Sequence, residues 1–294
     1  FIISILIGII SSGIDEKIDE LKKGKSQVLE SNHTLILGWS EKIYSIISEI
    51  IEANSNQHKP AIVILAERDK VEMEDDIRSK IEDFKNTKIV IRRGNPLIAN
   101  EIAIVSPNEA RSIIVLSPET ENADTHVIKT VLAFTNGKNR KKEPYSIVAE
   151  ITDQSNLESA ELVGNGEAVF VDSSDLIARI TAQTCRQSGL SIIYSQLLQF
   201  EGDELYFTEE KSLVGKTYKE CLFAYETSSV IGIYTQEGNV LINPEMDTIF
   251  NEGDQIIAIS EDDDTVVVSG KSQFNINKDV FNNQGEDEPY QEKT

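Results

Sequence analysis

The chain has 294 residues, and 39% of them are hydrophobic, which is enough to fill the core of one large or two ordinary domains. Its 28 basic residues are outnumbered by 50 acidic ones, and 28 − 50 gives a net charge of −22. This charge argues against nucleic acid as a partner and favours cations, although an ordinary solvated surface has the same surplus of carboxylates. The cysteines Cys185 and Cys221 form no C-x-x-C motif, so neither a disulfide framework nor a zinc cluster is expected.

The first twelve residues, FIISILIGIISS, are apolar and carry no charge. Such a stretch spans about half of the hydrocarbon core of a membrane as a helix. In the following GIDEKIDELKKGKSQVLE, apolar residues recur at helical spacing, and lysines come next, as they do on the cytoplasmic side of a membrane. We expect residues 1–13 to be the inner end of a transmembrane helix and residues 14–32 to be an amphipathic linker helix. A buried core helix is the alternative interpretation of the apolar stretch.

Residues 33–174 alternate short apolar strands with helical patterns, which is typical of a parallel sheet with helices on both faces. The expected strands are TLILG, AIVILAE, KIVIRRG, RSIIVLS, YSIVAEI and EAVFVD. Between the first two, isoleucines at positions 43, 46, 47, 50 and 51 form one buried helical stripe. The fold class is therefore α/β, with a Rossmann-like, doubly wound parallel sheet.

The pattern changes after the sixth strand. Residues 175–202 predict two consecutive helices that are broken at Ser188 and Gly189. Residues 203–270 predict a small β-rich lobe with the strands ELYF, SVIGIY, VLINP and DQIIAIS. The polar tail, residues 271–294, is expected to be disordered.

The turn after the first strand raises the question of a nucleotide site, because a dinucleotide-binding unit also begins with a strand, a glycine and a helix. If Gly38 is the first glycine of G-x-G-x-x-G, then Ser40 and Ile43 stand where the other two belong. Glu67 ends the second strand, where an acidic residue would meet a ribose hydroxyl, but carboxylates are common there. Gly38, Ser40 and Glu67 are therefore weak candidates for nucleotide binding. The chain also lacks a convincing catalytic set, so we expect a sensor and not an enzyme.

Several long motifs resemble the CASTOR and POLLUX family of cation channels. They are SGIDEKIDELKKGKSQVLESNHTLILGWSEK, LAERDKVEMEDDI, RRGNPL, ARSIIVLSPETENAD, VAEITD and EGDQIIAISEDDDT, in that order along the chain. The resemblance implies a regulator-of-potassium-conductance (RCK) domain with a Rossmann-like lobe, crossover helices at 175–202 and a small C-terminal lobe. It further implies a homotetrameric gating ring beneath a pore, with calcium as a regulator. It places the full-length protein in a membrane through upstream helices, with this region cytosolic: in the nuclear envelope in plants and in the plasma membrane in bacteria.

Calcium requires six to eight oxygen ligands, and the resemblance does not say which residues supply them. Suitably placed carboxylates follow the strands or flank the crossover helices: Glu150, Asp153, Asp172, Asp175, Glu201, Asp203, Glu204, Glu119 and Asp124. For each of them a helix cap or a solvated charge is the competing interpretation. The run Glu261–Asp264 is the densest acidic cluster, but it lacks the spacing of an EF-hand.

The sequence thus predicts a calcium-sensing gating-ring region of a tetrameric cation channel. Neighbouring chains are expected to exchange contacts through the crossover helices, at Ile180, Leu190, Ile192, Ile193 and Leu197. Two alternatives remain: a nucleotide-sensing regulatory subunit of a potassium transporter, and an NAD-dependent oxidoreductase. The apolar segment fused to the first strand distinguishes the channel, because both alternatives lack it.

Overall fold

The computed structural model describes residues 24–137 and 139–269, and the chain divides into two compact units between Ser195 and Gln196. The expected transmembrane end at 1–13, the first part of the linker and the tail from 271 lie outside the described residues. Within the described ranges, no helix combines the length and the apolar character needed to cross a membrane. The proposed lobe boundary near residue 203 stays a prediction.

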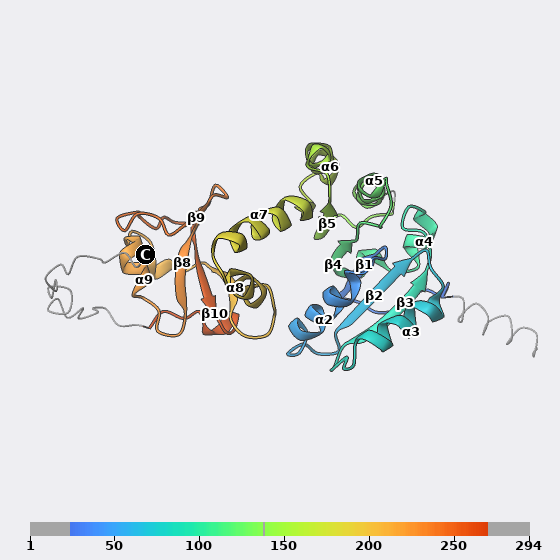
Figure 1. Cartoon of the computed structure of the whole chain (residues 1–294), viewed down its shortest axis with the longest axis horizontal. Coiled ribbons are helices and arrows are strands. Elements are labelled where there is room, and N and C mark those ends of the chain that lie inside the picture. The colour runs from blue at the N-terminus through green and yellow to red at the C-terminus, as the bar shows by residue number, and fades with distance from the viewer. Residues whose placement is uncertain (1–23, 138, 270–294) are drawn as a thin grey trace, which may run out of the picture. The chain divides into compact units, whose positions relative to one another are not determined.

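The first unit contains a six-stranded parallel sheet in the order β3-β2-β1-β4-β5-β6 (Figure 1). Its strands are β1 (His33–Leu37), β2 (Ala61–Ala66), β3 (Lys88–Arg93), β4 (Ala110–Val115), β5 (Ile147–Ile151) and β6 (Ala168–Asp172). All six coincide with the predicted apolar runs. The order places β1 and β4 side by side at the centre, with the chain winding outward from each, so the predicted doubly wound fold is confirmed.

Helices connect these strands and cover both faces of the sheet. They are α2 (Ile43–Ala53), α3 (Lys70–Lys80), α4 (Ala99–Ala103), α5 (Ala123–Thr135) and α6 (Leu157–Gly164). Helix α7 (Ser173–Arg186) follows the last strand, β6. Because side chains alternate along a strand, Leu35 and Leu37 of β1 join the core beneath α5, whereas Ile36 joins the core beneath α2. Ile43, Ile47 and Ile51 are buried there, which confirms the predicted stripe.

Residues 24–32 form an extended strap and not the predicted helix, while the rest of the predicted linker helix, residues 14–23, lies outside the described residues. Gly24 has a φ of +69°, and its carbonyl accepts a hydrogen bond from the Arg93 N–H at 3.2 Å. The Val28 N–H donates to the Ile104 carbonyl at 2.7 Å, and the Val28 side chain is buried in the core. The strap therefore satisfies its backbone groups through the sheet region and not through helical bonds.

The second unit is built on a four-stranded antiparallel sheet in the order β7-β10-β8-β9. Helix α8 (Leu190–Leu197) precedes it, and its elements are β7 (Glu204–Thr208), α9 (Tyr218–Leu222), β8 (Ser229–Tyr234), β9 (Val240–Ile242) and β10 (Gln255–Ser260). Tyr218, Phe250 and Ile256 form the centre of its core. The short strands and the helix break before Leu190 agree with the prediction.

Candidate functional site: the carboxyl edge of the parallel sheet

The carboxyl ends of the central strands β1 and β4 border a cleft of about 390 Å³. Connections leave β1 and β4 toward opposite sides of the sheet, so the cleft lies at the point where the strand order reverses. Gly38, Trp39, Glu67, Arg68, Leu116 and Thr120 are among its lining residues. In open α/β sheets this is the usual position of a ligand.

Gly38 makes the sharp turn from β1 toward α2. Its φ is +94°, a conformation that side-chain-bearing residues rarely adopt, and an added Cβ would lie 3.1 Å from the Leu116 carbonyl oxygen. The glycine is therefore required by backbone conformation and by close approach to β4. This geometry explains the residue without any nucleotide.

We expect Gly38→Ala to lower the free energy of unfolding by about 1–3 kcal/mol, because the turn becomes strained and the Leu116 carbonyl must move. Chemical denaturation checks this. Gly166→Ala is the matched control, since Gly166 has a φ of +74° but nothing within 4 Å of an added Cβ. Equal losses in the two variants would contradict the role of the contact with Leu116.

The other two nucleotide candidates lie in surroundings unlike those of a complete glycine fingerprint. The Ser40 hydroxyl is buried and has no hydrogen-bond partner among the described residues. The Glu67 carboxylate accepts a hydrogen bond from the Asn95 side chain at 3.0 Å. Ile43, in place of the third glycine, is fully buried in the core. The Arg68 guanidinium stacks over the Trp39 ring at 5.3 Å, so an aromatic side chain lies at the mouth of the cleft.

Two of the predicted metal ligands, Glu119 and Glu150, contact adjacent residues of the loop between β1 and α2. Glu119 accepts a hydrogen bond from the Glu41 backbone N–H at 3.2 Å. Glu150, whose side chain is only 12% exposed, forms an ion pair with Lys42. The sequence prediction missed Lys42, and only its position in the loop after Gly38 could have suggested a contact with the neighbouring strand ends.

Asp172 and Asp175 begin α7, next to the end of β5. Asp172 pairs in register with Ile151, one residue beyond Glu150. One Asp172 oxygen accepts a hydrogen bond from the Asp175 N–H at 2.9 Å, and its Oδ2 is buried without a partner among the described residues. Asp175 forms an ion pair with Arg179 at 2.5 Å. Asp172 therefore caps the helix and keeps one oxygen unengaged beside the end of β5.

Asp124 and Asp153 are held by hydrogen bonds between α5 and the loop after β5. Asp124 is buried and accepts four hydrogen bonds, from the backbone and side chain of Thr152, the Asp153 N–H and the Asn156 side chain, at 2.8–2.9 Å. Burial raises the pKa of Asp124, but these hydrogen bonds outweigh it and hold the pKa below its usual range. Hydrogen bonds from the Ser155 side chain and backbone also lower the pKa of Asp153. Both carboxylates hold the loop, and a metal would have to displace these donors.

The remaining candidates lie in the second unit, at the ends of β7 and β10. Glu201 and Asp203 are exposed, and no hydrogen bond or ion pair is seen for either within the described ranges. Glu204 lies near the Tyr206 phenol, and burial, together with the charges of Glu204 and Asp262, raises the pKa of Tyr206 to about 12.

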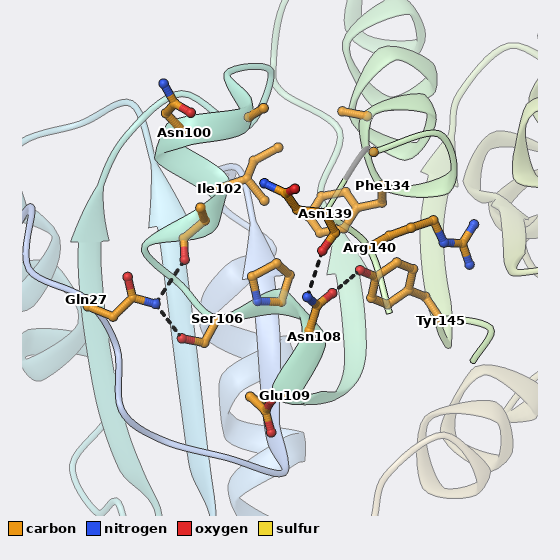
Figure 2. A pocket seen from close by; sticks show the side chains of 15 residues that line it. Gln27, Asn100, Ile102, Ser106, Asn108, Glu109, Phe134, Asn139, Arg140 and Tyr145 are labelled. Atoms are coloured by element: carbon orange, nitrogen blue, oxygen red, sulfur yellow. Dashed lines mark hydrogen bonds between the residues drawn. The ribbon is translucent and has the colours of Figure 1, made fainter. Parts of the chain in front are cut away.

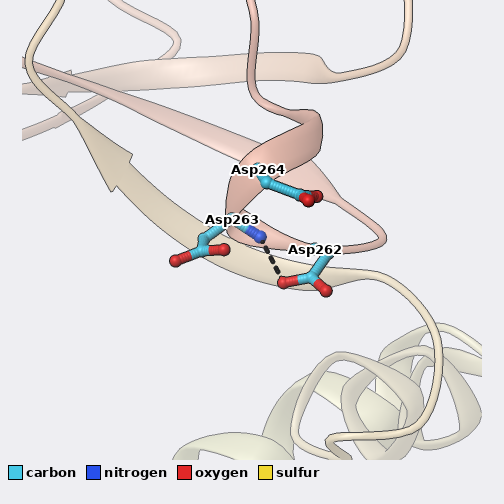
Figure 3. Close-up of side chains that lie close together, drawn as sticks. All are labelled: Asp262, Asp263 and Asp264. Atoms are coloured by element: carbon cyan, nitrogen blue, oxygen red, sulfur yellow. Dashed lines mark hydrogen bonds between the residues drawn. The ribbon is translucent and has the colours of Figure 1, made fainter. Parts of the chain in front are cut away.

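The aspartates of the acidic run project from the turn after β10 (Figure 3). One oxygen from each of Asp262, Asp263 and Asp264 lies within 4.8 Å of the others. The turn itself is fixed by the Thr265 hydroxyl, which contacts the Ser260 hydroxyl at 2.6 Å and the Asp262 carbonyl at 2.6 Å. The cluster is exposed, so its geometry also suits a solvated acidic turn.

Two protein families match the sequence in separate regions. Residues 29–147 match the calcium-activated potassium channel slowpoke-like RCK domain, and residues 174–277 match the family described as Castor and Pollux, part of voltage-gated ion channel. These matches confirm the resemblance found in the sequence motifs.

Individual relatives are ion channels. The chain is 37% identical over 268 residues to the ion channel CASTOR of Lotus japonicus, covering 90% of this chain and 31% of that protein. It is 37% identical to the probable ion channel POLLUX of Arabidopsis thaliana, covering 90% of this chain and 32% of that protein. It is 22% identical to the calcium-gated potassium channel TvoK of Thermoplasma volcanium, covering 87% of this chain and 71% of that protein. The chain thus spans about a third of the length of its CASTOR and POLLUX relatives.

A solved structure supports the fold. The human SLO3 gating ring superposes with a TM-score of 0.55 at 14% sequence identity, covering 80% of this chain and 45% of that chain. At this identity the likeness concerns the fold alone. The relatives are channels and not enzymes, in agreement with the expectation that the chain performs no catalysis.

Proposed function

We propose that this chain is the ligand-sensing regulatory region of a cation channel, because it is related to the CASTOR and POLLUX ion channels along 90% of its length. We assign its two units to the two lobes of an RCK domain. The match of residues 29–147 to a slowpoke-like RCK domain supports this assignment, as does the match of residues 174–277 to a family described as part of a voltage-gated ion channel. The region acts by coupling and not by catalysis. A ligand that binds one conformation more tightly shifts the population toward it and so changes the pore.

We further propose calcium as the ligand. The observation that carries this proposal is the group of carboxylates at the carboxyl edge of the sheet, where Glu119 and Glu150 contact adjacent residues of the loop after β1 and Asp172 keeps a buried oxygen unengaged. Carboxylates are hard oxygen donors that suit calcium. The names of two matches, the calcium-gated channel TvoK and the calcium-activated slowpoke-like domain, favour the same ion.

Assembly as a homotetramer is part of the proposal, and the apolar surface of the crossover helices supports it. Leu176 and Ile177 on α7 are 46% and 60% exposed, and Ile192 and Ile193 on α8 are 64% and 52% exposed. Apolar side chains grouped at this exposure are typical of a surface that another chain covers. The full-length channel would lie in a membrane, with this region in the cytosol. We propose the nuclear envelope as that membrane for a plant protein.

Calcium should raise the melting temperature of the chain beyond the effect of ionic strength. Binding to the folded state stabilises it by RT ln(1 + [L]/Kd), about 2.7 kcal/mol when calcium is a hundredfold above Kd. Differential scanning calorimetry in calcium chloride and in potassium chloride of equal ionic strength measures the difference. Glu150→Gln and Asp172→Asn should abolish the calcium-specific part.

Matched substitutions in the second unit distinguish a calcium site at the carboxyl edge of the sheet from one at the acidic turn after β10. Asp262→Asn and Glu201→Gln should leave the calcium-specific shift intact if the site lies at the carboxyl edge. A shift that disappears only with Asp262→Asn would move the site to the acidic turn. Equal shifts in calcium and potassium would refute calcium sensing, and stabilisation by NAD or ATP instead would favour the nucleotide-sensing alternative.

A further inference from the structure

The first unit has a second cavity at the opposite edge of its sheet, and its volume of about 620 Å³ suits a small ligand (Figure 2). We call it the amino-edge pocket, because it lies between α4 and the C-terminal end of α5, before the starts of β4 and β5. We propose that this pocket binds an uncharged ring compound with an amide-like edge. The inference does not rest on calcium sensing, because none of the carboxyl-edge residues lines this pocket.

The interior of the amino-edge pocket is mainly apolar. Ile102 of α4 and Phe134 of α5 are almost fully buried, at 6% and 3% exposure, and line it from opposite sides. Ala133 and Pro107 add further carbon surface. The Phe134 ring is also held edge-on by Tyr145, with ring centres 5.9 Å apart. This rigid apolar wall favours a flat ring over a flexible polar ligand.

Side-chain amides border this apolar interior; in Figure 2 the Asn139 amide points toward the cavity, whereas the Asn100 amide points away from it. The Gln27 amide donates to the Ala103 carbonyl at 3.1 Å and to the Ser106 hydroxyl at 2.9 Å. The Asn139 side chain forms no hydrogen bond among the described residues. It offers one donor group and one acceptor, which complements a lactam or amide edge.

The two charged side chains that line the pocket, Arg140 and Glu109, do not point into it. The Arg140 guanidinium forms two hydrogen bonds to the Glu167 carboxylate, at 2.8 and 2.7 Å, and a third to the Thr135 carbonyl at 2.7 Å. In Figure 2 this guanidinium and the Glu109 carboxylate point away from the centre of the cavity. An ionised ligand would thus lose its hydration without gaining a free counter-ion, so a neutral ligand is favoured.

Occupancy of the pocket would contact the strap, because Gln27 belongs to residues 24–32 and lines the cavity. The strap is the segment that leads from the N-terminal part of the chain into β1. A bound compound could therefore influence this connection independently of events at the carboxyl edge.

Isothermal titration calorimetry on the whole chain tests the proposal with three matched probes: 2-quinolone, which carries a neutral lactam, quinoline-2-carboxylate, which is anionic, and naphthalene, which has no polar edge. We expect 2-quinolone to bind with a dissociation constant in the millimolar range or below, at least about tenfold more tightly than either analogue. Ala103→Trp, at the exposed rim, should fill the cavity and abolish binding. Ala53→Trp, on the exposed end of α2, is the matched control and should retain it.

A second variant tests the role of the amides without filling the cavity. Asn139→Leu should weaken 2-quinolone about tenfold and leave naphthalene unchanged or tighter, whereas Asn100→Leu, whose amide points away from the cavity, is the matched control and should change neither. Undetectable binding of 2-quinolone at millimolar concentration, equal affinity for the carboxylate, or full binding by Ala103→Trp would each overturn the proposal. Circular dichroism melting of every variant ensures that lost binding is not lost folding.

Discussion

Replacing Asp124 by alanine is expected to lower the free energy of unfolding by about 3–5 kcal/mol, the largest loss for any single substitution considered. The variant removes one buried carboxylate and leaves four donors, on Thr152, Asp153 and Asn156, without their acceptor. Each is a charge-assisted hydrogen bond in a buried setting, where an unpaired group is costly. Urea denaturation followed by circular dichroism measures the loss.

The direction of pH dependence gives an independent check of Asp124. Its pKa is lower in the folded state than in the unfolded chain, so its contribution is fully present above the unfolded pKa and is lost as the pH falls through the folded value. The difference in stability between the wild type and Asp124→Ala should therefore shrink in strong acid. Asp75→Ala, at an exposed position on α3, is the matched control and should change little at any pH. A small, pH-independent effect of Asp124→Ala would contradict the role of this network.

His33 should make the fold less stable as the pH falls below about 6.5. Its side chain is fully buried at the start of β1, and neither ring nitrogen has a hydrogen-bond partner within the described ranges. Burial lowers the pKa of His33, while the nearby backbone of Val105 and Glu30, outside hydrogen-bond geometry, and the charges of Glu30 and Glu109 partly oppose this shift. Below this pH the unfolded chain therefore binds a proton at His33 that the folded chain does not bind. As the pH falls, the free energy of unfolding decreases by up to about 1.4 kcal/mol per pH unit.

Comparison of the wild type with His33→Leu isolates this effect, because leucine fits an apolar site and cannot be protonated. The wild type should lose stability between pH 6.5 and 5 relative to the variant. His58→Gln, at an exposed position, is the control and should follow the wild type. Parallel stability curves for the wild type and His33→Leu would show that His33 is protonated freely in the folded state.

The fold could be predicted from the sequence because its signals are local. Each buried strand is a short apolar run that ends at a turn residue, and the buried isoleucines of α2 recur at helical spacing. The strap could not be predicted in the same way. The helical spacing that precedes it gives no sign that Val28 enters the core of the sheet, and this tertiary contact overrides the local pattern.

The candidate site could be predicted from the sequence only in part, because its contacts join residues that are far apart along the chain. Carboxylates that follow strands were identified, but the sequence cannot tell a buried acceptor from a free ligand. Asp124 receives its donors from a loop 28–32 residues away, and Glu150 meets Lys42 across 108 residues of chain. The amino-edge pocket is another case, since its lining residues come from separate segments between Gln27 and Tyr145.

The ion pair between Lys42 and Glu150 has a consequence for any cation that binds at the carboxyl edge. The lysine ammonium is a competitor tethered permanently at the site, so an incoming ion must displace it before it can use the Glu150 oxygen. The apparent affinity for the cation equals the intrinsic affinity multiplied by the fraction of chains in which Lys42 has already moved away. A monovalent ion offers Glu150 no more charge than the ammonium that it replaces, whereas a divalent ion offers twice as much. If calcium binds at this edge as proposed, the ion pair would disfavour monovalent ions and would set the concentration at which the divalent ion binds.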